Sequence, residues 1–222
     1  MKKFLALSGG KDSMACLFLT KDELDGAIYI DTGYAYPETH VMIDLAETLI
    51  PVHRVRVDRD AYVATYGLPA DVVPVEWTVA GQAITGQKSY LIHPSLQCCF
   101  DNLARPLLNK AKELGATHIV YGQRNEETHK SPARNGTVVE GMTRVHPIEE
   151  WSREDVILFL KQHMEVPNHY YLTRSSLDCY DCPAYHSVSQ DLHRWTKEHH
   201  PDYYAAYAVK RNAVLAAVEA SL

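Results

Sequence analysis

The stretch that says most about the fold reads Phe4-Leu5-Ala6-Leu7-Ser8-Gly9-Gly10-Lys11-Asp12-Ser13. Residues 4–7 are apolar and predict a short buried strand, and the apolar positions within 12–19 predict a helix. The two glycines between them allow the backbone to turn sharply. A strand, a glycine turn and a helix in this order predict a nucleotide-binding α/β protein.

The rest of the chain continues this alternation of strands and helices. Further strands are expected at residues 27–30, 52–57 and 118–121, and helices at 37–49 and 102–114. The alternation predicts an α/β fold with a mostly parallel, doubly wound sheet and helices on both faces.

The second half of the sequence is less regular. The expected elements are a small hairpin or edge strand at 138–145, a helix at 152–163 with Ser152 as its N-cap, a loop-like stretch at 166–187, and helices at 189–199 and 203–220. At 222 residues the length suits one domain. We therefore expect a single domain over 1–222, with 189–222 as a helical C-terminal extension.

Composition narrows the class of protein. The formal net charge is −6, which argues against broad coating of nucleic acid, although a nucleic-acid substrate in a local basic groove stays open. No apolar run approaches the roughly 18 residues of a membrane span, and the N-terminal apolar run is too short for a signal peptide. A cytoplasmic location is expected, where structural disulfides among the five cysteines are not.

The glycine turn has the chemistry of a phosphate-binding loop. Successive amides of such a turn can point at one anion, and the helix N-terminus adds partial positive charge. Ser8 and Ser13 offer hydroxyl donors, and Lys11 can neutralise a phosphate. The spacing excludes a Walker A loop, and no Rossmann glycine pattern is present.

The segment 8–13 resembles the SGGxDS signature of PP-loop ATP pyrophosphatases, also called adenine nucleotide α-hydrolases. The resemblance implies that ATP, with Mg²⁺, is cleaved between the α- and β-phosphates to leave an adenylylated substrate. Lys11 and Asp12 would then be catalytic. A second segment, Asp31-Thr32-Gly33-Tyr34 followed by Pro37-Glu38-Thr39, resembles a sequence block of the phosphoadenosine phosphosulfate (PAPS) reductase branch. This resemblance implies further nucleotide contacts at Asp31, Thr32 and Gly33.

Four of the five cysteines suggest a metal site. Cys98 and Cys99 are adjacent, and Cys179 and Cys182 form a C-x-x-C pair, whereas Cys16 is expected to be a small packing residue. A single zinc ion stays open, but zinc ligands usually lie two to four residues apart. Adjacent cysteines suit an iron–sulfur cluster better, since each can ligate a different iron. A chain without metal is the remaining alternative.

The cysteine pattern resembles that of [4Fe-4S] adenylyl-sulfate reductases, with the two pairs about 80 residues apart. The resemblance extends over about 2–187, through three segments that read Arg105-Pro106-Leu107, Gly122-Gln123-Arg124-Asn125-Glu126-Glu127-Thr128 and His146-Pro147-Ile148. It implies that the four thiolates hold a [4Fe-4S] cluster. Gly122 would lie at the nucleotide. Arg124 would be a third catalytic residue and, helped by Lys130 and Arg134, would hold the anionic end of the substrate. A functional role stays open for His93 and His129, and ordinary loop residues are the favoured interpretation.

Two departures from those reductases shift the functional prediction. The reductases carry a nucleophilic cysteine in a C-terminal tail, whereas no cysteine follows Cys182 in these 222 residues. Their phosphate loop is usually degenerate, whereas this chain keeps the ATP-type loop. We therefore expect an enzyme that adenylylates a substrate for sulfur transfer.

Two alternatives stay open: a sulfonucleotide reductase that uses a partner's thiol, and a nonenzymatic nucleotide or redox sensor. The expected partners are an adenine nucleotide and a sulfur donor or thiol protein, with no membrane. A homodimer through 203–220 stays open beside the packing of this helix on its own core.

Overall fold

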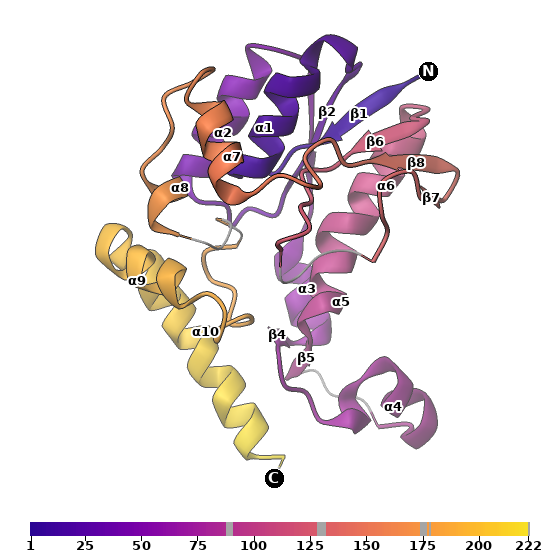
Figure 1. Ribbon diagram of the computed structural model, residues 1–222. Helices are drawn as coiled ribbons and strands as arrows, with labels where there is room; N and C mark the ends of the chain where they lie inside the picture. Colours follow the sequence, from indigo (N-terminus) through magenta and orange to yellow (C-terminus); the bar gives the residue numbers. More distant parts are fainter. Residues whose placement is uncertain (88–90, 128–131, 174–176, 178, 222) are drawn as a thin grey trace. The chain divides into compact units, whose positions relative to one another are not determined.

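The computed structural model describes residues 1–87, 91–127, 132–173, 177 and 179–221. The chain forms two compact units, and Figure 1 labels their α-helices and β-strands. The first unit comprises 1–31, 37–55 and 106–171, and the second comprises 32–36, 56–105 and 172–222. The expectation of one domain with a C-terminal extension stays a prediction.

The first unit contains a six-stranded sheet. Its strand order is β3 (Val52–Arg56), β2 (Gly26–Asp31), β1 (Lys3–Ala6), β6 (His118–Val120), β8 (Met142–Val145) and β7 (Val138–Val139). β1 pairs in parallel with both β2 and β6, and β6 pairs in parallel with β8. The short strand β7 is antiparallel to its hairpin partner β8. The predicted α/β class with a mostly parallel sheet is confirmed.

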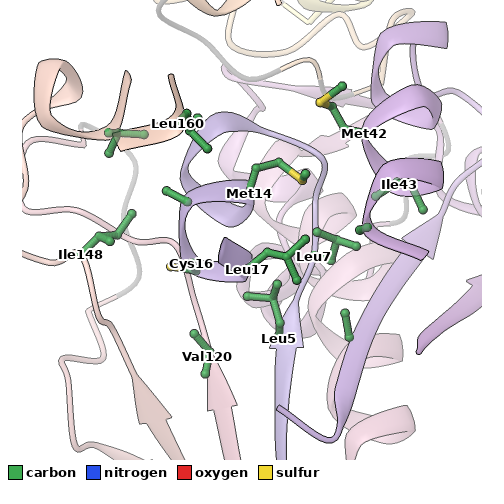
Figure 2. Close-up of a cluster of buried hydrophobic side chains, with 14 of the residues drawn as sticks. Leu5, Leu7, Met14, Cys16, Leu17, Met42, Ile43, Val120, Ile148 and Leu160 are labelled. Carbon is green, nitrogen blue, oxygen red and sulfur yellow. The ribbon is translucent and has the colours of Figure 1, made fainter. Parts of the chain in front are cut away.

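Helices flank this sheet and complete its core. They are α1 (Lys11–Thr20), η1 (Lys21–Glu23), α2 (Pro37–Glu47), α6 (Arg105–Glu113), α7 (Arg153–Leu160) and α8 (His169–Leu172). Figure 2 shows the buried cluster in which Leu5 of β1 meets Met14 and Leu17 of α1 and Leu160 of α7. Each such side chain contributes about 1.5–3 kcal/mol when it leaves water. The core therefore fixes the start of α1 against the end of β1.

The second unit is built from short elements. They are α3 (Arg59–Tyr66), β4 (Leu68–Ala70), η2 (Val75–Trp77), α4 (Val79–Thr85), β5 (Ile92–Pro94), α5 (Ser95–Cys99), the π-helix η3 (Phe100–Ala104), α9 (Gln190–His199) and α10 (Pro201–Glu219). β4 and β5 pair in parallel, and Val214 and Ala217 of α10 join their small core. Part of the apolar surface of α10 is thus used within its own unit, while a homodimer stays a prediction.

Two expectations about helices were wrong. The helix expected from residue 102 is preceded by seven more helical residues, because α5, η3 and α6 follow one another without a break from Ser95 to Glu113. The π-turn in the middle disturbs the helical period of apolar residues that sequence reading relies on. The stretch 166–187 was expected to be loop-like, yet it contains the short helix α8. Among the residues described, no helix is long and apolar enough to span a membrane.

Candidate functional site

The predicted phosphate loop lies at the switch point of the sheet. β1 has β2 on one side and β6 on the other, so the strand order changes direction between β1 and β6. Ligands of open α/β sheets bind beyond the carboxyl ends of the strands at such a point. Residues 7–13 follow β1 and residues 121–127 follow β6. The fold therefore brings the two segments singled out by sequence to one place.

The loop is held in shape by its own serines and glycines. Gly9 adopts φ +75°, and a Cβ there would lie 3.0 Å from the side chain of Thr39, so only glycine fits without strain. The Ser13 hydroxyl donates to the Gly10 carbonyl at 2.9 Å and lies 3.1 Å from the Ser8 hydroxyl. Gly10 precedes α1 and supplies no side-chain cap to its first turn. The α1 N-terminus is therefore left to attract an anion.

Two buried cations meet on one carboxylate beside this N-terminus. Lys11 Nζ lies 3.0 Å from Asp12 Oδ2, and Arg124 Nε donates to Asp12 Oδ1 at 2.6 Å. Arg124 also donates to Glu126 at 2.9 Å. Lys11 is 8% exposed and Arg124 is 5% exposed. The three residues predicted to be catalytic therefore form one charged cluster, in which Asp12 holds the cations that a phosphate chain would need.

Gly122 lets β6 approach this cluster closely. A Cβ at Gly122 would lie 2.6 Å from the Asp12 carbonyl carbon and 2.7 Å from the Ser13 nitrogen, which no real side chain could tolerate. Glu127 adds a second carboxyl group nearby. Burial raises the pKa of Glu127, and the charge of Asp12 raises it further. Two neighbouring carboxyl groups of this kind are also suited to Mg²⁺.

The predicted nucleotide-contact residues at the end of β2 belong partly to the first unit and partly to the second. Asp31 is the last residue of β2 and is half-buried. Thr32 and Gly33 belong to the second unit, where Thr32 lines a cavity and Gly33 lies against the Arg56 guanidinium. The nucleotide contacts expected at Asp31, Thr32 and Gly33 stay a prediction.

The four cysteines of the predicted metal site line one cavity of about 120 Å³ within the second unit. Cys98 and Cys99 come from α5, and Cys179 and Cys182 come from the segment before α9. The fold thus gathers thiols that are about 80 residues apart in the sequence. Among the described residues, no group of three or more His, Cys, Asp or Glu side chains is arranged to hold a single metal ion.

Polar groups accompany three of these sulfur atoms. The Thr32 hydroxyl lies 3.3 Å from Cys179 Sγ, and the Tyr185 hydroxyl lies 3.7 Å from Cys99 Sγ. The Asn102 amide donates to Cys98 Sγ at 3.7 Å. Burial raises the pKa of the Cys98 thiol, and the charge of Arg59 opposes that shift. Hydrogen bonds to sulfur of this kind tune and stabilise thiolate-bound metal centres.

Sequence reasoning missed a buried ion pair at this cavity. Arg59, which is 1% exposed and lines the cavity, donates to Asp181 Oδ1 at 2.6 Å. Asp181 also accepts from Lys210. The available signal was Asp181 itself, since a carboxylate within a C-x-x-C pair requires a cation once it is buried. Its partner could not be read from the sequence, because Asp58-Arg59-Asp60 resembles a solvated charged turn.

The cavity fits an iron–sulfur cluster in the chemistry of its donors. It offers four sulfur atoms, hydroxyl and amide groups beside three of them, and a buried guanidinium. A centre with four thiolate ligands is anionic, and the guanidinium has the opposite charge. The cluster itself stays a prediction.

The other residues that sequence reasoning considered have simpler settings. Cys16 is buried in the core of the first unit, with its thiol 3.7 Å from the Tyr121 carbonyl. His93 is not in a loop but is buried in β5. Arg134 is exposed and donates to Asn125 at 3.0 Å. His129 and Lys130 lie outside the described residues.

Comparison with known proteins identifies the family to which this chain belongs. The chain matches the phosphoadenosine phosphosulfate reductase domain family over residues 2–185 and belongs to that family. This confirms the resemblance inferred from the motifs.

Individual relatives are distant. The chain is 26% identical over 174 residues to a phosphoadenosine 5'-phosphosulfate reductase of Alkalilimnicola ehrlichii, covering 74% of this chain and 62% of that protein. It is 27% identical over 207 residues to an adenosine 5'-phosphosulfate reductase of Allochromatium vinosum, covering 86% of this chain and 72% of that protein. The chain thus spans less than two thirds of the first of these relatives. A phosphoadenylyl-sulfate reductase structure from Candida auris is 18% identical, with a TM-score of 0.48 and 77% of each chain covered.

Proposed function

We propose that this protein cleaves ATP between its α- and β-phosphates and adenylylates an acceptor that then receives sulfur. The observation that supports the proposal most strongly is the cluster of Lys11, Asp12 and Arg124 at the N-terminus of α1. Two buried cations beside an open helix N-terminus suit the triphosphate chain of ATP better than the shorter phosphosulfate of adenylyl sulfate.

In the proposed step, an oxygen of the acceptor forms a bond to the α-phosphorus as the bond from that phosphorus to the bridging oxygen breaks. Pyrophosphate leaves with the electron pair of the broken bond. Lys11, Arg124 and the loop amides then stabilise the negative charge that develops on pyrophosphate. Mg²⁺ bound to the phosphates supplies further charge neutralisation, with Asp12 and Glu127 as its candidate protein ligands.

Binding of the phosphates requires a change of partners at Asp12. Its carboxylate accepts from Arg124 and pairs with Lys11. An incoming phosphate chain can replace it on both cations, because phosphate oxygens suit the planar fork of arginine and the point charge of lysine.

We further propose that Cys98, Cys99, Cys179 and Cys182 hold a [4Fe-4S] cluster in the second unit. Bound there, the cluster would supply sulfur at the sulfide level, which forms a bond to the adenylylated acceptor as AMP leaves. This chain's own residues contribute the four thiolates, and Thr32, Tyr185 and Asn102 hold three of the sulfur atoms in place. Zinc in the same cavity is the alternative metal.

The test is to identify the products formed from ATP labelled at the α-phosphorus. With a suitable acceptor and Mg²⁺, we expect pyrophosphate and an adenylyl product, not ADP and phosphate. Arg124→Met should lower the rate at least about a hundredfold, since an interaction with developing charge is lost. The matched control is Arg54→Met, because Arg54 pairs with Asp44 and Glu47 on the surface of the same unit. Equal losses in both variants would contradict the proposal.

Family membership favours a second candidate, a sulfonucleotide reductase that takes its nucleophilic thiol from a partner. It predicts release of sulfite and AMP from adenylyl sulfate, with thioredoxin or glutathione supplying the two electrons. Sulfite formation with no cleavage of ATP would replace the leading proposal by this one. Nucleotide binding without turnover of either substrate would favour a sensor.

A further inference from the structure

Arg59 has unused hydrogen-bonding capacity where water cannot reach it. A guanidinium has five N–H donors, and Nη1 donates to Asp181. Nε and Nη2 are buried and have no partner at hydrogen-bond distance in the described part of the chain, although the guanidinium lies close enough to the Cys98 thiol to lower its pKa. Unsatisfied buried donors on a charged group are costly, so the native protein is expected to provide an acceptor. The cavity that Arg59 lines is where this acceptor would lie.

The charges around Arg59 leave a positive excess. The single carboxylate of Asp181 is shared between Arg59 and Lys210. The two cations also lie over the Tyr34 ring, at 4.7 and 4.9 Å from its centre. The other carboxylate of this group, Asp60, is exposed and accepts from the Tyr34 hydroxyl. Among the described residues, Asp181 is thus the one buried carboxylate that these two cations share, and an anion in the cavity would complete the balance.

The cavity also indicates the class of anion. Its lining includes all four cysteines of the predicted cluster, and three of their sulfur atoms have a hydroxyl or amide neighbour. A metal centre held by four thiolates carries negative charge, and it needs compensation when it is buried.

We propose that Arg59 is the counter-charge and positioning residue of the metal–thiolate centre held by Cys98, Cys99, Cys179 and Cys182. The inference rests on the cluster of the proposed function. Asp181 orients the guanidinium through Nη1, so that Nε and Nη2 face the centre. Lys210 keeps Asp181 paired and does not line the cavity.

This arrangement provides a matched pair of variants. Arg59→Met and Lys210→Met each remove one of the two cations on Asp181 and leave the other in place. Only the first removes a cation from the cavity. Arg59→Lys keeps the positive charge and loses the planar guanidinium group. It therefore tests whether the charge alone is enough to retain the iron.

The experiment measures iron, acid-labile sulfide and the rate of iron release to a ferrous chelator, on full-length protein purified under argon. Arg59→Met should release iron about ten to a hundred times faster than the wild type, the range found when outer partners of metal sites are lost. Arg59→Lys and Lys210→Met should stay within about threefold of the wild type. Thermal unfolding of all four proteins separates this effect from a general loss of stability.

Three results would overturn the inference. Equal release from Arg59→Met and the wild type would show that the centre does not depend on Arg59. Equal acceleration in Arg59→Met and Lys210→Met would assign the effect to the loss of the ion pair alone. Wild-type protein without iron and sulfide would reject the cluster assignment and the role of Arg59 together, whereas the first two results would leave the cluster standing.

Discussion

At the scale of single residues, the predicted nucleotide site depends on Gly122, which has no side chain. Gly122 touches the backbone of Asp12 and Ser13, and backbone atoms in the first turn of α1 cannot move aside as a flexible side chain would. The end of β6 is thereby held against the phosphate loop. Arg124 reaches Asp12 because it lies two residues beyond this contact.

Gly122→Ala should therefore disturb the loop. We expect a loss of about 1–3 kcal/mol in the free energy of unfolding from overpacking, and at least about tenfold weaker ATP binding. Denaturant titration and calorimetry measure the two effects. Gly141→Ala is the control, since Gly141 has φ +81° and no atom near its missing Cβ. It should lower stability through backbone strain and leave ATP binding unchanged; weakened binding in both variants would contradict this account.

His169 gives the stability a defined dependence on pH. Burial lowers its pKa to about 4, against the opposing charge of Glu38. The unfolded chain has a histidine pKa of about 6.5, so it binds more protons than the folded chain between pH 6.5 and 4. This share of stability is complete above about pH 7 and falls by up to about 3 kcal/mol as the pH drops to 4.

His169→Gln should make the fall in unfolding free energy between pH 7 and 4.5 shallower. Urea titrations at several pH values give the slope, which does not depend on any constant loss of stability caused by the substitution. A slope unchanged from the wild type would mean that the pKa of His169 is not lowered in the folded protein.

At the scale of elements, sequence reasoning worked where one segment carries its own signals. β1, the loop and α1 are contiguous, and their apolar and glycine positions define them locally. It assigned no element within 58–101, where β4 and β5 are three residues each and depend on partners distant in the sequence. Arg59 and Asp181 were missed as a pair for the same reason, since they are 122 positions apart.

α7 shows a local signal that the structure reproduces. The Ser152 hydroxyl accepts from the Asp155 amide at 3.1 Å, and the Asp155 carboxylate accepts from the Ser152 amide at 2.9 Å. This capping box begins a helix that packs on α1. It therefore supports the helix that carries the phosphate loop.

Ser152→Ala should lower the free energy of unfolding by about 1 kcal/mol, the usual effect of losing an N-cap. Ser152→Asp keeps an oxygen that can accept from the helix amides, so its loss should be a few tenths of a kcal/mol. Chemical denaturation of the two variants beside the wild type measures the difference. Identical losses for alanine and aspartate would mean that the cap does not stabilise α7.

At the scale of the whole molecule, the fold sorts the five cysteines into two groups. Cys16 belongs to the core of the first unit, and the other four line the cavity of the second. The sequence spacing already predicted this division. It could not predict Thr32 beside Cys179, because the two residues are 147 positions apart in the sequence.

This grouping of the cysteines predicts which cysteine substitutions leave the iron in the protein. Cys99→Ser should lose most of the iron and sulfide, which in the wild type should reach about four of each per chain. Cys16→Ala should keep both, although it removes a buried sulfur atom. Elemental analysis and the visible spectrum of anaerobically purified protein provide the measurement. Iron lost equally from both variants would contradict the assignment of ligands.

The preference for ATP is the central claim, and direct binding tests it most simply. Calorimetry on anaerobic protein with Mg²⁺ should compare adenylyl sulfate with an ATP analogue that has a methylene group between the α- and β-phosphates. We predict that the analogue binds at least about tenfold tighter, and that Lys11→Met removes most of this advantage, since hydrogen bonds to charged groups contribute about 1.5–3 kcal/mol. Tight binding of adenylyl sulfate with no detectable binding of the ATP analogue would contradict the account.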